Sequence, residues 1–208
     1  MDYISQFEVF KSKELSLDLT RGKPSEAQLD LSNGLINFDE KDFSMYGVDI
    51  RNYGEVKGLE ACRKLGSEIL GCSEDYIWSG GNSSLSLMSK FLSFLFIQGN
   101  GSGPWNNKER VSVLCPVPGY DRHFKLCETF GINMIPVSLK GEGPDLEEVR
   151  TLVESDESIR GIWWVPKYSN PTGDVYSLEV IKGRLDIFSG TKNKGTIFWE
   201  NAYTVPLD

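Results

Sequence analysis

Hydrophobic and polar residues follow two alternating patterns along most of the chain. Short runs of β-branched and aromatic residues predict strands at 76–78, 111–115, 132–137, 161–165 and 196–199. Between them, apolar residues at helical spacing predict helices at 56–70, 85–97, 121–130, 146–153 and 177–189. Strands that alternate with helices predict an α/β fold, with a mostly parallel sheet flanked by helices.

Two segments of this pattern carry further expectations. The helix at 85–97 is apolar nearly all round, which predicts that it is buried. Residues 1–45 read as an arm, with a short helix at 3–13 and alternating leucines at 15, 17 and 19 that need another surface to cover them. Residues 44–53 read as a loop, and residues 46–208 as the larger domain.

The stretch from Gly161 to Tyr176 organises the rest of the chain. Its apolar strand ends before Pro166, which has no backbone N–H, and a turn of sequence Asn-Pro-Thr-Gly follows at 170–173. Asn170 therefore follows the carboxyl end of a predicted parallel strand, where ligands bind in open sheets. An ordinary strand-to-helix turn is the alternative interpretation.

Three other predicted strands also end in residues that could bind a ligand. Glycines and then Asn82, Ser83 and Ser84 precede a helix, as in a phosphate site, although a serine that only caps the helix fits equally. Tyr120 could stack on a planar ligand or simply pack in the core. Glu200 and Tyr203 offer a carboxylate and a phenol, or a solvated acid and a packed ring.

Charge and composition limit the partners and the location. Lys and Arg number 22 against 30 Asp and Glu, and no basic block occurs, which argues against nucleic-acid and anionic-membrane partners. No apolar window is long enough for a membrane span, and the N-terminus lacks the apolar core of a signal peptide, so we expect a cytoplasmic protein. The four cysteines form no CxxC pair and His123 is the single histidine, so no zinc site is predicted.

Taken together, the strand ends match one cofactor. A phosphate site, a flat ring, a carboxylate for a ring nitrogen, and Asn and Tyr groups for a phenolic oxygen describe pyridoxal 5′-phosphate. The motifs GGNSSL, PVPGYDRHF, NPTG and ENAY occur in that order. With them, the chain resembles the fold-type I pyridoxal-phosphate aminotransferases of the aspartate aminotransferase-like group, over essentially all 208 residues.

The resemblance implies a role for most of the residues at the strand ends. Asn82, Ser83 and Ser84 would hold the cofactor phosphate. Tyr120 would stack on the pyridine ring. Glu200 would pair with the protonated ring nitrogen, although the family usually has Asp at this position.

Four further residues receive roles in the same way. Asn170 and Tyr203 would bind the 3′-oxygen of the cofactor. Tyr53, in the motif RNYGEVKGL, would reach the phosphate of the neighbouring subunit, which implies a homodimer. Gly22 would lie near the substrate carboxylate. Residues 1–45 would then be the N-terminal arm and part of a small domain, and residues 46–208 the first part of the large cofactor-binding domain.

The sequence departs from the family pattern after its last predicted strand. Relatives continue to a strand that supplies the Schiff-base lysine, whereas no lysine follows Lys194 here. We therefore expect a truncated chain with an incomplete sheet, inactive by itself. The first hypothesis is an aminotransferase that transfers an amino group from an amino acid to a 2-oxo acid, of the aspartate type. The alternatives are a fold-type I lyase and a non-catalytic fragment that binds the cofactor or a partner.

Overall fold

The computed structural model describes residues 2–16, 22–37, 39, 43–45, 47–183, 186–188 and 194–203. The chain forms two compact units, Met1–Gly54 and Glu55–Asp208. The division at residue 45 that the sequence suggests stays a prediction.

The first unit contains short elements and, among its described residues, no buried side chain. Its elements are α1 (Tyr3–Lys11), α2 (Glu26–Asp30), a 3₁₀ helix (Asn33–Ile36), β1 (Ser44–Met45) and β2 (Val48–Asp49). The helix predicted at 3–13 is confirmed, whereas the loop predicted at 44–53 is wrong, because β1 and β2 pair antiparallel there. Leu17 and Leu19 of the predicted alternating segment lie outside the described residues.

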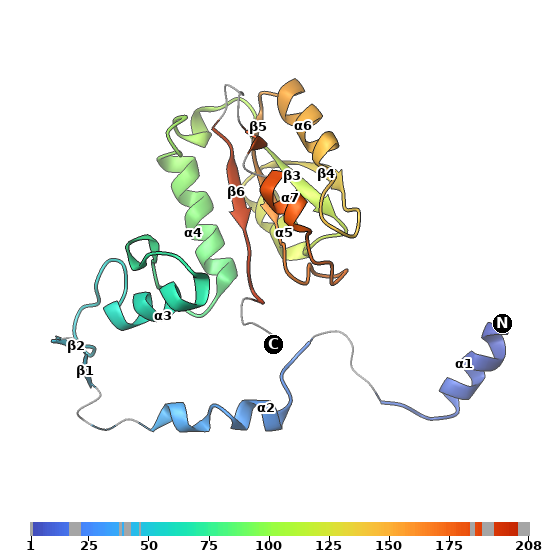
Figure 1. Cartoon of the computed structure of the whole chain (residues 1–208), viewed down its shortest axis with the longest axis horizontal. Coiled ribbons are helices and arrows are strands. Elements are labelled where there is room, and N and C mark those ends of the chain that lie inside the picture. Colours follow the sequence, from blue (N-terminus) through green and yellow to red (C-terminus); the bar gives the residue numbers. More distant parts are fainter. Residues whose placement is uncertain are drawn as a thin grey trace. The chain divides into compact units, whose positions relative to one another are not determined.

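The second unit is built on a four-stranded parallel sheet (Figure 1). Its strands are β3 (Ser112–Val117), β4 (Asn133–Ser138), β5 (Ile159–Trp164) and β6 (Thr196–Trp199), in the order β4-β3-β5-β6. All three strand pairs are parallel. The α/β fold with a parallel sheet is therefore confirmed.

Helices cover both faces of this sheet. They are α4 (Ser84–Ile97), α5 (Asp121–Thr129), α6 (Leu146–Ser155) and α7 (Leu178–Gly183). The unit also contains α3 (Glu60–Leu70), which lies against a 3₁₀ helix at Glu74–Tyr76, and a second 3₁₀ helix at Trp105–Asn107. Residues from α4 and α5 pack in one apolar cluster, and residues from α6 and α7 pack in the other. No helix in the described ranges combines the length and the apolar character needed to cross a bilayer.

Neighbouring residues of the strands point into opposite clusters, which explains the continuous apolar runs in the sequence. Val113 and Trp163 belong to the cluster of α4 and α5. Leu114 and Trp164 belong to the cluster of α6 and α7. Strands that are buried on both faces read as unbroken apolar segments, because neither face meets water.

Two expectations need correction. Residues 76–78 do not form a strand: Tyr76 ends a 3₁₀ helix, and Ile77 is buried where it approaches Gly66 of α3. Helix α4 is only partly buried, since Leu92 and Leu95 are inaccessible while Phe94 is 50% exposed. The other predicted strands and helices lie within a few residues of their expected bounds, except that α3 begins only at Glu60 and that residues 186–188, predicted as helix, are not part of α7.

Candidate functional site

One pocket of about 170 Å³ lies at the carboxyl edge of the sheet. It is lined by Ser84, Tyr120, Val165, Asn170, Glu200, Ala202 and Tyr203. Tyr120 follows β3, Asn170 follows β5, and Glu200 comes directly after β6. Because these three strands are parallel neighbours, their carboxyl ends bring the three side chains to the same place.

The N-terminus of α4 borders this pocket. Ser84 is the first residue of the 14-residue helix, and Gly81 precedes it with a φ of +63°, which glycine adopts without strain. The hydroxyl oxygen of Ser83 accepts a hydrogen bond of 3.3 Å from the backbone N–H of Ser86 and so caps the helix. Asn82 is exposed and does not line the pocket. Free N–H groups and the helix dipole make this end suited to an anion.

Glu200 is held against a residue that sequence reasoning did not select. Its carboxylate Oε2 lies 2.5 Å from Nε2 of His123, and the two side chains are 11% and 2% exposed. The contact is an ion pair when the ring is protonated, although the two atoms lack hydrogen-bond geometry. His123 lies one helical turn after Tyr120, and the two rings are perpendicular with centroids 5.2 Å apart. This spacing of one helical turn between Tyr120 and His123 was the signal in the sequence that could have identified His123.

The loop that carries Asn170 is closed by backbone hydrogen bonds. The N–H of Tyr176 donates to the carbonyl of Pro166 at 2.9 Å, and the N–H of Ser169 donates to Asp174 at the same distance. Burial raises the pKa of Tyr176 to about 12, while interactions with the Val165 backbone and the Ser169 side chain act in the opposite direction. The exposed Asn170 is thus presented by a loop with a buried tyrosine at its base.

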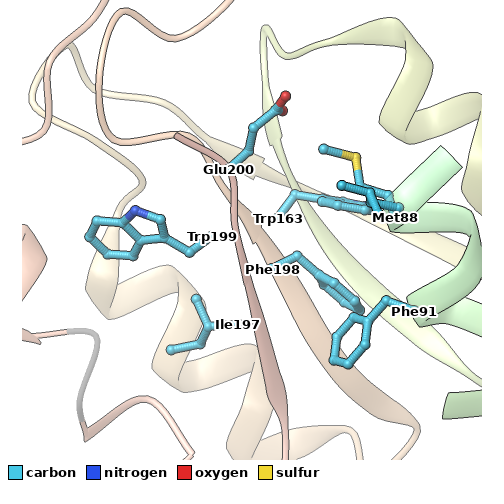
Figure 2. Close-up of a pocket in the computed structure, with 8 residues that line it drawn as sticks. Met88, Phe91, Trp163, Ile197, Phe198, Trp199 and Glu200 are labelled. Atoms are coloured by element: carbon cyan, nitrogen blue, oxygen red, sulfur yellow. The ribbon is translucent and has the colours of Figure 1, made fainter. Parts of the chain in front are cut away.

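A second, apolar pocket of about 260 Å³ lies between α4 and β6 (Figure 2). It is lined by Leu87, Met88, Phe91, Trp163, Ile197, Phe198, Trp199 and Glu200. Figure 2 shows the carboxylate of Glu200 pointing away from the rings of Phe91 and Phe198. Glu200 therefore lies where the apolar pocket and the polar pocket meet.

Gly22 and Tyr53 belong to the first unit, and both are exposed there. Tyr53 has 97% of its surface accessible. The roles predicted for these two residues stay predictions.

A polar pocket at the carboxyl ends of parallel strands is the arrangement in which α/β domains with an open sheet bind their ligands. A family model for aspartate amino-transferases matches residues 2–207, so the chain belongs to the aspartate amino-transferase family.

Individual relatives agree with this assignment. The aspartate aminotransferase of Corynebacterium glutamicum is 41% identical over 208 residues, which cover 98% of this chain and 48% of that protein. A crystal structure of an aspartate transaminase from the same organism matches with a TM-score of 0.86 at 39% identity, covering 97% of this chain and 48% of that one. A crystal structure of a protein from Corynebacterium diphtheriae matches with a TM-score of 0.87 at 43% identity, covering 96% of this chain and 50% of that one. The chain spans about half the length of the curated relatives it matches.

Proposed function

We propose that the pocket around Glu200 binds pyridoxal 5′-phosphate, and that the chain serves an aspartate-type aminotransferase reaction between an amino acid and a 2-oxo acid. The observation that carries the proposal is that Ser84, Tyr120, Asn170, Glu200 and Tyr203 line one pocket. The expected homodimer and cytoplasmic location stay predictions of the sequence.

The chemistry of these side chains fits the cofactor. The N-terminus of α4 with Ser84 offers donors and a favourable dipole for the phosphate. Asn170 and Tyr203 offer an amide and a phenol for the 3′-oxygen, and the ring of Tyr120 offers a surface for the pyridine. Glu200 offers a nearly buried carboxylate that would hold a proton on the pyridine nitrogen.

These residues would act together on the bound amino acid. When bound, the cofactor serves as an electron sink for charge that develops at the α-carbon of the substrate. Glu200 would favour that function by keeping the ring nitrogen protonated, and His123 would keep the carboxylate in place. Asn170 and Tyr203 would fix the orientation of the ring, because two donors on one oxygen restrict its rotation.

Cofactor binding can be measured directly on the purified chain. Titration with pyridoxal 5′-phosphate, followed by absorbance, gives a dissociation constant for the wild type and for Asn170→Ala and Glu200→Ala. Removing one hydrogen bond to a charged group is worth about 1.5–3 kcal/mol, so each variant should bind at least about tenfold more weakly. Glu200→Ala should also move the absorbance maximum of the bound cofactor to shorter wavelength.

The control is Glu154→Ala, an exposed carboxylate on α6, which should leave both affinity and spectrum unchanged. Equal dissociation constants in all four proteins would refute the assignment of the pocket. The reaction is tested on the protein isolated from its native source, as conversion of aspartate and 2-oxoglutarate to oxaloacetate and glutamate. No conversion by the cofactor-loaded native protein would reject the aspartate-type reaction while leaving the binding result intact.

A further inference from the structure

The imidazole of His123 is enclosed by aromatic side chains. One face of the ring stacks on the indole of Trp163, with centroids 4.2 Å apart and planes inclined by only 5°. The ring of Tyr120 meets it edge-on at 5.2 Å. Since Glu200 contacts Nε2, the imidazole has one ring stacked on it, a second ring perpendicular to it and a carboxylate at its polar atom. Its orientation therefore depends on where the indole lies.

The indole of Trp163 is itself fixed from two sides. Its Nε1–H donates a hydrogen bond of 3.3 Å to Sγ of Cys127, which is fully buried on α5. The ring of Phe198, opposite Trp163 in the β5–β6 pairing, packs against it at 4.5 Å. Rotation of the indole would break the hydrogen bond and disturb the ring contact. Its plane is thus set by α5 and β6 together.

Cys127 is suited to accept the indole hydrogen bond because it is buried away from water. It contacts the thiol of Cys115 on β3, and that contact, with burial, raises the pKa of Cys115. Both cysteines are free thiols in the core. A buried indole N–H that lost this sulfur would be left without a partner, which costs more than the bond itself contributes.

We propose that Trp163, anchored by Cys127, is a positioning residue that fixes the imidazole of His123 against Glu200 and thereby orients this carboxylate in the polar pocket. The consequence for the cofactor rests on the proposed function, whereas the consequence for His123 does not. Trp163 itself does not line the polar pocket, so it acts through its neighbour.

The chain offers a matched control in the next residue. Trp164 is also buried, but it belongs to the cluster on the other face of the sheet and meets Tyr176 edge-on at 5.5 Å. Its Nε1 has no hydrogen-bond partner within the described part of the structure. Trp163→Phe and Trp164→Phe therefore make the same chemical change in the same strand, and only the first removes an anchored stacking partner of His123.

The first measurement uses the protein without cofactor. His123 is the single histidine of the chain, so its ring protons give one identifiable set of NMR signals. The indole ring current shifts these signals in the wild type. Trp163→Phe and Cys127→Ala should each change their chemical shifts and broaden them, whereas Trp164→Phe should leave them as in the wild type. Cys127→Ser keeps an acceptor for the indole N–H, so its His123 signals should resemble those of the wild type.

The second measurement is the affinity for pyridoxal 5′-phosphate. Partners that orient a metal-ligating histidine typically account for a 10–100-fold effect, and by analogy we expect Trp163→Phe and Cys127→Ala to weaken binding about tenfold. Trp164→Phe should bind like the wild type, and Cys127→Ser should recover most of the affinity. The absorbance maximum of the bound cofactor should move in the same direction as in Glu200→Ala.

The two measurements separate the inference from the proposed function. If the wild type binds no cofactor, the proposed function fails, and the His123 signals alone decide the positioning role. Signals of His123 that are identical in Trp163→Phe, Cys127→Ala and Trp164→Phe would overturn the inference, whatever the cofactor affinity. Equal changes in all three variants would overturn it too, because they would reflect a general loosening of the core.

Discussion

Tyr176 should make the second unit lose stability between pH 10 and 12. Tyr176 is only 4% exposed, and burial raises the pKa of its phenol to about 12 from an ordinary value of 10.0. Below pH 10 the phenol is protonated in both the folded and the unfolded chain. Above pH 10 the unfolded chain releases the proton first, which stabilises the unfolded state.

The magnitude follows from the difference in pKa. Each pKa unit corresponds to about 1.4 kcal/mol, so the free energy of unfolding should fall by about 1.4 kcal/mol by pH 11 and by up to about 2.7 kcal/mol above pH 12. Tyr176→Phe removes this contribution. The contributions of other tyrosines and of lysines are common to both proteins and cancel in the difference.

Urea unfolding of the wild type and of Tyr176→Phe at pH 8 and pH 11 measures this difference. We expect the wild type to lose about 1.4 kcal/mol relative to the variant between the two pH values. Tyr76→Phe, which removes a hydroxyl at a position that is 81% exposed, controls for the substitution itself. A difference between wild type and Tyr176→Phe that stays constant within about 0.5 kcal/mol would show that burial does not perturb this phenol.

Two further predictions concern the elements that carry the polar pocket. Ser83→Ala removes the side-chain cap of α4 and should lower the free energy of unfolding by about 0.5–2 kcal/mol in urea; an unchanged midpoint would contradict the capping role. Gly119→Ala would place a Cβ against the carbonyl oxygen of Pro116 and 2.9 Å from the ring of Phe124. It should cost about 1–3 kcal/mol and weaken cofactor binding by displacing Tyr120, and wild-type affinity and stability would refute that close approach.

The sequence alone determined most of the sheet. The run Gly161–Val165 predicted a buried strand because its residues are apolar on both faces, and β5 lies there. Residues 76–78 gave the wrong prediction because three residues are too few to establish a period. Helix α4 was predicted to be fully buried from its all-round apolar character, yet Ile97 is 62% exposed. Composition shows that a face can be buried, and packing decides which face is.

The candidate site could also be predicted from the sequence only in part. Tyr120, Asn170 and Glu200 could be predicted because each follows a strand, and the carboxyl ends of parallel strands meet at one edge. The assignment of each residue to a cofactor group, with those of Tyr53 and Gly22, stays a prediction. The structure shows the side chain of Ser83 capping α4, and its role toward the cofactor phosphate stays a prediction as well.

Only the tertiary structure decided what surrounds Glu200. His123 lies on a helix and Trp163 on a strand that are far from Glu200 in sequence, and nothing in their local pattern indicates that their rings stack. The rotation of helix α5 about its own axis and the register of β5 against β6 bring these side chains together. Local propensity fixes the type of an element, whereas these two quantities are set by packing across the whole sheet, and so they appear only once the chain has folded.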